Sequence, residues 1–422
     1  MKTEMLSPEI LRQGNAQCAV TALSPADRAC LHTYYDVCPW SPSGRFFALL
    51  MLPFEDRLPG PSDAAEVCVL DLKDRTMRAV RPTTAWGFQT AAKQQWGRSD
   101  RWLYFNDRRD GQPVGVRCDL EAGSERVLDG PIWHVSPDET WAVSPCLIRA
   151  NLTQPGYGVS VLPEQQAVNT QTATRDDGFF RVDLATGRCT LWLSLADIWA
   201  ALPNRADLSD QVLYAFHVKF NPQGTRLLLV VRAKPASGKY QPMLLTCRAD
   251  GSALRVVLPC SRWHGPPRAN HPTWHPDGER ILMNVGVDGR STFVLIHADT
   301  GAIEPLVTEP PGVGHPTLTP DARYLLTDVY EDGPACQLGR IRWVDMQRRS
   351  WRDLLTMPRP RFGHGTGLDA SQRVDLHPVL DRTGRRFAFT AAPDGRRRVF
   401  VADPSLPTGT DFAFVPRPRQ IE

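Results

Sequence analysis

A short pattern recurs seven times along the chain and restricts the folds that it can adopt. Each copy has a turn rich in Pro, Gly, Asp or Ser, followed by an apolar run of β-forming residues, as in WHPDGERILMNV from Trp274. The other copies begin at Trp40, Trp96, Val135, Phe220, Leu318 and Leu380. A tight turn that leads into an apolar strand is typical of a β-hairpin. The pattern therefore predicts seven similar hairpins.

A second pattern alternates with the first. It is an apolar run that ends in an aspartate and a turn, and its aspartates are Asp71, Asp119, Asp183, Asp250, Asp299, Asp345 and Asp403. Each of them is expected to accept backbone hydrogen bonds in its turn, which is a structural role. Two alternating hairpin signals at intervals of roughly 40 to 65 residues are typical of a β-propeller. The predicted fold class is all-β, with a single seven-bladed β-propeller domain over residues 1–422.

Two segments stand outside the repeats. The stretch at about residues 18–30, beginning CAVTALSP, is expected to add an outer strand to the last blade, because a propeller must close its circle. The longest insertion, at about residues 149–177, is polar and without periodicity. It is expected to form a loop over one face of the propeller.

Composition excludes several classes of function. The net charge is only +3, and no basic tail or patch argues for nucleic acid. No run of eighteen apolar residues exists, so no membrane span is expected. The start of the chain has no apolar signal-peptide core, and the 10 cysteines show no CxxC pair. We expect a cytoplasmic protein with free, buried thiols, with a periplasmic location as the open alternative; the sequence does not indicate an oligomeric state.

The repeats show which histidines occupy equivalent positions in different blades. In a propeller the first strand of each blade lines the central channel, and we expect these strands to begin near Asp36, Lys93, Ile132, His217, His271, His315 and His377. Four of these seven positions are histidine, although only 10 of 422 residues are His. Gln372 and Asp375 precede His377 closely enough to join them. We call His217, His271, His315 and His377 the channel histidines.

Imidazole together with carboxylate and amide oxygen suits Mn, Zn, Fe or Ni. The channel histidines therefore suggest a metal site. Two alternatives remain at this stage: the histidines could satisfy a polar channel by bonding to carbonyls and water, or they could act in catalysis without a metal. His275 lies within a turn and is interpreted as structural.

Several motifs resemble those of the oligogalacturonate lyase family, which are seven-bladed propellers that cleave short pectic fragments by β-elimination. The segments are VTALSPADRACLHTYYDVCPWSPSG, FHVKFNPQG, NHPTWHPDG and QRVDLHPVLDRTG. The resemblance implies that His271, Gln372 and His377 are ligands of a divalent ion, manganese first, with Zn, Fe, Ni or Ca as alternatives. It implies that His217 is the general base, although a ligand or structural role for it stays open.

The chain departs from the family's motif at one position. The family's middle histidine in the last blade falls on Asp375, which adds negative charge to the site. His315 would be a fourth ligand or a proton carrier.

The chain is more loosely similar to the propeller-fold ulvan lyases. Their Tyr and Arg pair would correspond to Tyr157 and Arg175 in the long insertion, and Lys93 lies in the second blade, where those enzymes use histidine.

These observations predict a metal-assisted lyase that cleaves a uronic-acid-containing oligosaccharide. A neutral His would remove the proton on C5, a cation would neutralise the carboxylate, and Tyr157 or a His would protonate the leaving oxygen. The alternatives are a non-catalytic binding or sensor propeller, and a hydrolase or epimerase on the same scaffold. No GxSxG motif occurs, which argues against a propeller peptidase.

Overall fold

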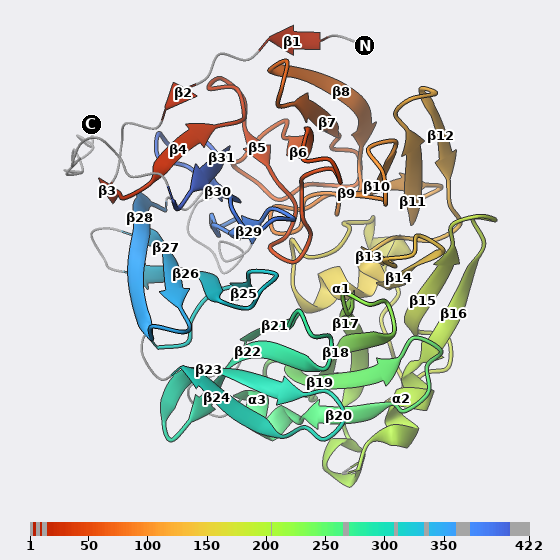
Figure 1. The fold of residues 1–422 in the computed structure, drawn as a ribbon. Helices are drawn as coiled ribbons and strands as arrows, with labels where there is room; N and C mark the ends of the chain where they lie inside the picture. The colour runs from red at the N-terminus through yellow and green to blue at the C-terminus, as the bar shows by residue number, and fades with distance from the viewer. Residues whose placement is uncertain are drawn as a thin grey trace, which may run out of the picture.

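Seven small antiparallel sheets are arranged in a circle around a central axis, so the protein is a seven-bladed β-propeller, as the repeats predict (Figure 1). The structure is a computed structural model, and it describes residues 3–5, 9–10, 15–203, 205–264, 270–307, 311–332, 337–359 and 372–405. Six blades have four consecutive strands, two of them with an added N-terminal strand, and the seventh joins three C-terminal strands to two N-terminal ones.

The first four blades run in chain order. Blade one contains β5 (Cys30–Leu31), β6 (Phe46–Met51), β7 (Ala65–Asp71) and β8 (Thr76–Thr83). Blade two contains β9 (Gln95–Trp96), β10 (Trp102–Arg109), β11 (Gln112–Asp119) and β12 (Ser124–Val127). Blade three contains β13 (His134–Val135), β14 (Trp141–Pro145), β15 (Gly178–Asp183) and β16 (Cys189–Ser194). Blade four contains β17 (Val212–Phe220), β18 (Arg226–Lys234), β19 (Gln241–Arg248) and β20 (Arg255–Leu258).

The last three blades complete the circle. Blade five contains β21 (Asn270–Trp274), β22 (Arg280–Val287), β23 (Arg290–His297) and β24 (Ile303–Val307). Blade six contains β25 (Thr317–Leu318), β26 (Tyr324–Asp332), β27 (Gln337–Asp345) and β28 (Ser350–Pro358). Blade seven contains β29 (Val379–Leu380), β30 (Phe387–Ala391) and β31 (Arg398–Asp403) from the C-terminal part, with β4 (Ala19–Ala22) beside them.

The N-terminal segment closes the propeller. β4 pairs antiparallel with β31, with Thr21 opposite Val401. Three further short strands lie on outer edges: β1 (Thr3–Met5) on blade one, β2 (Glu9–Ile10) on blade seven and β3 (Asn15–Ala16) on blade six. One segment thus covers the open edges of three blades, which would otherwise present unpaired backbone groups.

The repeated aspartates organise the outer turns. Asp71, for example, accepts hydrogen bonds from the backbone N–H groups of Lys73 and Asp74 at 3.0 and 3.1 Å. Similar bonds to backbone N–H groups two or three residues onward are made by Asp119, Asp183, Asp250, Asp345 and Asp403. For Asp299 no such backbone bond is found among the described contacts, and its carboxylate pairs with the guanidinium of Arg226 at 2.7 Å.

Two first strands depart from the expected starting positions. Blade one begins at Cys30, before Asp36. Closer to the expected position, the chain pairs with the second strand at a single bridge, between Trp40 and Phe47. Blade four begins at Val212, because β17 is long and contains a register shift between Ala215 and His217.

The long insertion contains local structure rather than only loop. It includes α1 (Leu147–Thr153) and the 3₁₀ turn η1 (Pro163–Gln165), and α1 lies beside β17 towards the middle of the propeller (Figure 1). Other short helical segments are α2 (Leu195–Ala201), η2 (Arg205–Leu208) and α3 (Cys260–His264). Within the described residues, every helix is too short or too polar to cross a bilayer.

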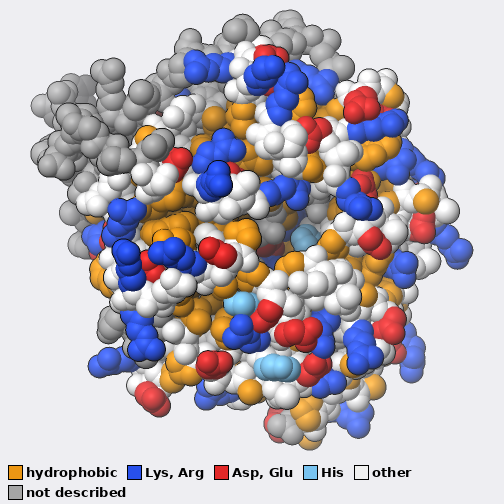
Figure 2. Space-filling model, in the orientation of Figure 1, with side chains coloured by type: hydrophobic (Ala, Val, Ile, Leu, Met, Phe, Trp, Pro, Cys, Tyr) orange, Lys and Arg blue, Asp and Glu red, His pale blue; other side chains and the backbone are white. Residues whose placement is uncertain are grey.

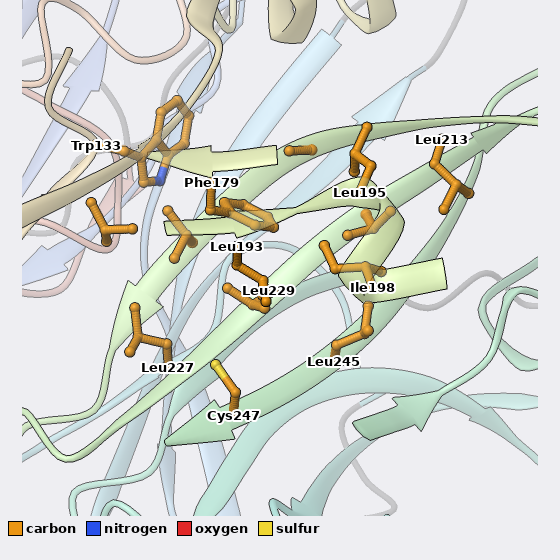
Figure 3. Close-up of a cluster of buried hydrophobic side chains, with 14 of the residues drawn as sticks. Trp133, Phe179, Leu193, Leu195, Ile198, Leu213, Leu227, Leu229, Leu245 and Cys247 are labelled. Atoms are coloured by element: carbon orange, nitrogen blue, oxygen red, sulfur yellow. The ribbon is translucent and has the colours of Figure 1, made fainter. Parts of the chain in front are cut away.

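The hydrophobic core lies between neighbouring blades. Between blades three and four, Phe179 and Leu193 pack with Leu229 and Leu245, and Ile198 of α2 covers them from outside (Figure 3). Burial of each such side chain stabilises the fold by roughly 1.5–3 kcal/mol. Nine cysteines lie in the described part of the chain, and all are free.

Candidate functional site

Three of the channel histidines lie in direct contact. The side-chain rings of His271 and His315 have centroids 3.8 Å apart, and those of His315 and His377 lie 4.4 Å apart. The three residues come from blades five, six and seven, so the repeat register places them side by side at one end of the channel. We call His271, His315 and His377 the histidine cluster.

The backbone is strained at two members of the histidine cluster. His271 has φ of 56° and His377 has φ of 44°, which is the left-handed region that side chains with a Cβ seldom adopt. Lys93, at the equivalent position of blade two, has φ of 54°. Such conformations cost about 1–3 kcal/mol each and concentrate at functional sites.

Hydrogen bonds orient two of the cluster rings. Nδ1 of His271 donates to the carbonyl oxygen of Gly314 at 2.6 Å. Nδ1 of His315 donates to the carboxylate of Asp328, at 3.0 Å from both oxygens. A carbonyl or carboxylate behind one ring nitrogen is the usual arrangement for a histidine whose other nitrogen binds a metal.

His32 provides a contrast. Its Nδ1 lies 2.6 Å from the hydroxyl of Thr390, and its Nε2 donates to the backbone carbonyl of His377 at 2.8 Å. Both nitrogens are therefore occupied, and His32 supports the backbone of His377 rather than facing a ligand.

Burial keeps the channel histidines neutral. Loss of solvent lowers the pKa of His217, His271, His315 and His377 well below 6.5, and nearby cationic groups or other histidines lower it further. Neutral imidazole is the form that binds a metal or accepts a proton.

His217 lies apart from the histidine cluster. Its ring stacks between Trp133, at 4.7 Å, and Phe216, at 3.9 Å, and its buried Nε2 has no hydrogen-bond partner. The ring of Tyr34 stands between the two groups, 5.7 Å from His217 and 4.8 Å from His377. The ring of Tyr34 therefore separates the histidine cluster from His217.

Gln372 and Asp375 join the cluster in different ways. Both are buried, and the side-chain nitrogen of Gln372 has no partner. The carboxylate of Asp375 lies 4.0 Å from Nε2 of His377, but it also pairs with Arg373 at 2.7 Å and with Arg359 at 3.5 Å. The extra negative charge that the sequence places here is thus balanced by arginines.

Tyr157 and Arg175 are not brought together as an active pair. Tyr157 is buried, and its ring lies 5.9 Å from that of His217. Its hydroxyl accepts a hydrogen bond from Nη2 of Arg373 at 3.3 Å. Arg175 is exposed, and within the described contacts nothing links it to the channel histidines. Arg373 occupies the place beside Tyr157 that the sequence comparison assigned to Arg175.

A buried ionic group joins three blades near the histidines. Asp36 pairs with Lys93 and Lys219, each at 3.1 Å, and these residues come from blades one, two and four. Lys219 also donates to the carbonyl of Pro272 at 2.7 Å and to the hydroxyl of Tyr35 at 3.0 Å. Two lysines facing one aspartate leave this part of the channel positively charged.

Imidazole nitrogens and an amide oxygen are suitable ligands for a divalent ion, although the residues here do not form a complete coordination shell. In the described ranges, no group of three or more His, Cys, Asp and Glu side chains is arranged to hold a metal. However, Nε2 of His315 and Nε2 of His377 are buried without any hydrogen-bond partner. Each of these nitrogens costs free energy while it is unpaired, and in the neutral ring an unprotonated Nε2 can accept a hydrogen bond or bind a metal.

One face of the propeller is hollowed at its centre (Figure 2). Figure 2 shows a hollow in the middle of the molecule, with histidine and basic side chains inside it. A small cavity next to the cluster is lined by His377, Asp375, Arg373, Gln89 and Arg397, among others.

Sequence reasoning missed several residues of this site. Tyr34 separates the two imidazole groups, Asp328 holds His315, and Lys219 pairs with Asp36. Tyr34 and Asp36 lie in HTYYD, within a segment that resembles the lyases, so that signal was available. Asp328 lies inside an ordinary strand pattern and carried no signal of its own.

The fold and the site define a seven-bladed propeller with a histidine-lined, positively charged channel. No protein-family model and no curated protein sequence matches the chain. Two solved structures of oligogalacturonate lyases are similar to it. One, in complex with manganese, has a TM-score of 0.67 and 17% identity, over 95% of this chain and 97% of that one.

The second oligogalacturonate lyase, from Vibrio parahaemolyticus, has a TM-score of 0.66 and 15% identity, over 95% of this chain and 98% of that one. The resemblance inferred from the sequence motifs is thus confirmed in fold. At such low identity the likeness establishes the fold alone.

Proposed function

We propose that this protein is a metal-assisted lyase that cleaves a uronic-acid-containing oligosaccharide by β-elimination. The observation that carries the proposal is the division of the site: a histidine cluster with two unpartnered nitrogens stands on one side of Tyr34, and neutral His217 stands on the other. The fold that this chain shares with an oligogalacturonate lyase bound to manganese supports the same reading.

His271, His315, His377 and the side chain of Gln372 would hold the ion. When bound, a divalent cation would neutralise the substrate carboxylate and so acidify the neighbouring C–H bond. Asp375 is the less favourable ligand of the set, because Arg373 already pairs with its carboxylate. Imidazole and amide ligands leave the positive charge of the ion available to an anionic sugar.

His217 would remove the proton on C5. Its Nε2 is unpartnered, and the ring is held by Trp133 and Phe216, so it presents a fixed acceptor. Burial lowers its pKa well below 6.5, which makes the imidazolium costly in the free protein. An anionic substrate beside it would raise that pKa again, because opposite charge favours the protonated form.

Tyr157 would protonate the leaving oxygen. Burial raises its pKa above 10, so the hydroxyl keeps its proton at neutral pH. Its ring borders that of His217 at 5.9 Å, so acid and base face the same space. Arg373, Lys93 and Lys219 contribute positive charge that attracts an acidic glycan.

A second function, a non-catalytic propeller that binds a ligand in the same channel, is favoured by one observation. The described residues contain no complete group of metal-binding side chains. Such a module would bind an acidic ligand through its basic channel without changing it.

Metal analysis of protein purified without chelator tests the metal site. The wild-type protein is expected to retain a divalent ion, and His271→Ala is expected to lose it because a ligand is removed. His275→Ala is the matched control: His275 lies in the same segment, but its Nδ1 accepts from the backbone N–H of Asp277. Equally little Mn, Zn, Fe and Ni in all three proteins would contradict the metal site.

Product masses then separate the functions. A lyase yields an unsaturated fragment that is lighter by one water than the product of hydrolysis. A binding module leaves the oligosaccharide intact even when calorimetry shows that it binds.

A further inference from the structure

The buried carboxylate of Asp328 contacts His315, the backbone of His377 and the residue whose carbonyl accepts a hydrogen bond from His271. Asp328 lies in the middle of β26 and is 0% exposed. Its Oδ1 accepts from the backbone N–H of His315 at 2.7 Å, and both oxygens lie 3.0 Å from Nδ1 of the same residue. Its Oδ2 accepts from the backbone N–H of His377 at 3.2 Å.

The third histidine is reached through the backbone. Nδ1 of His271 donates to the carbonyl of Gly314, the residue directly before His315. Gly314 has φ of 71°, and a Cβ there would overlap both the carbonyl and the carboxylate of Asp328. Only glycine allows this segment to lie against Asp328, so the position of the acceptor for His271 depends on the same contact.

A tyrosine completes the surroundings of the carboxylate. The hydroxyl of Tyr330 donates to Oδ2 of Asp328 and accepts from the backbone N–H of Leu376 at 3.0 Å. Asp328 therefore joins blade six to the segment that enters blade seven. An acceptor-only group at this point requires Nδ1 of His315 to carry the proton, which leaves Nε2 free to accept or to bind.

We infer that Asp328 is the positioning residue of the histidine cluster: it fixes the tautomer of His315 and the backbone on which His271 and His377 depend. The inference rests on the proposed function and extends it, because Asp328 would hold the histidine cluster in the tautomer and geometry that can bind a metal. Partners of this kind behind metal-binding histidines typically change metal affinity about 10- to 100-fold.

The test compares Asp328→Asn with the wild type in two measurements. The first is ¹H–¹⁵N NMR of metal-free protein labelled at histidine, which reports the tautomer of each ring. The wild type is expected to show Nδ1–H at His315. In Asp328→Asn the amide can donate to Nδ1, so His315 is expected to change to the Nε2–H form.

The second measurement is a Mn²⁺ titration followed by electron paramagnetic resonance. Asp328→Asn is expected to weaken binding by about 10- to 100-fold. Asp345→Asn is the matched control, because it makes the same change elsewhere in the same blade, where Asp345 caps a turn and lies near Arg323 and Arg348, away from the histidines. The control is expected to keep the wild-type tautomer and affinity.

The outcomes separate this inference from the proposed function. A wild-type His315 in the Nε2–H form would overturn the role of Asp328 without any variant. An unchanged tautomer, or unchanged Mn²⁺ affinity, in folded Asp328→Asn would also overturn it. A wild type that binds no Mn²⁺ would refute the metal site, and the tautomer measurement would still decide the role of Asp328.

Discussion

His217→Ala is expected to reduce lyase turnover by about 10²- to 10⁴-fold, the usual effect of losing a general base. The physical reason is that Nε2 of His217 is a buried acceptor without a hydrogen-bond partner, and Tyr34 separates it from the histidine cluster. Initial rates on a uronic-acid oligosaccharide measure the effect. Metal content should stay at the wild-type level, because Tyr34 separates His217 from the histidine cluster.

His217→Phe serves as the matched variant. It keeps a ring between Trp133 and Phe216 but removes the accepting nitrogen, so it separates chemistry from packing. Equal loss of turnover in both variants, with similar melting temperatures, supports a base. Loss of the metal in both would instead make His217 a ligand, and normal turnover would exclude both roles.

Asp36→Asn is expected to lower the free energy of unfolding by about 3–5 kcal/mol, because it leaves two buried ammonium groups without their counter-charge. Lys93 and Lys219 both contact this carboxylate at 3.1 Å, and all three side chains are almost completely buried. Chemical denaturation measures the change. Adding Lys93→Met to Asp36→Asn should restore part of the stability, because one uncompensated charge is removed.

Asp74→Asn is the control for the stability experiment. Asp74 pairs with Arg45 at 3.0 Å, but both side chains are largely exposed, and such pairs contribute about 0–1 kcal/mol. If Asp36→Asn were no more destabilising than Asp74→Asn, the channel charges would not be an important part of the fold.

The same cluster predicts a pH dependence. Burial alone would raise the pKa of Asp36, but Lys219 and Lys93 outweigh that effect and hold it far below its usual range. In the unfolded chain the pKa of Asp is about 3.9. The stabilising contribution of Asp36 is therefore fully present above about pH 4 and is lost as pH falls further. Asp36→Asn should flatten this part of the curve of stability against pH.

The propeller and the histidine cluster could be predicted because both depend on repetition. Each blade repeats one local pattern, so His271, His315 and His377 occupy equivalent positions and must converge when the blades form a circle. The register depends only on counting residues from a turn. It therefore holds even where the first strand is short, as in β25 and β29.

The partners of the cluster could not be predicted, because their contacts cross between blades and the repeat pattern carries no information about such contacts. Asp328 meets His377 across 49 residues of sequence, and Lys219 meets Tyr35 across 184. Arg373 lies only two residues before Asp375, yet its pairing with Tyr157 depends on how the insertion folds over the channel. Such contacts can be identified only once the arrangement of all seven blades in space is known.

The most direct test of the account is ultraviolet absorbance during incubation of the wild-type protein, supplied with Mn²⁺, with a panel of uronic-acid oligosaccharides. β-Elimination creates a conjugated C4–C5 double bond, so the account predicts a steady absorbance rise with at least one substrate. A chelator should abolish the rise, and His217→Ala should nearly do so. New reducing ends without any rise, or binding without cleavage across the whole panel, would contradict the proposal of a lyase.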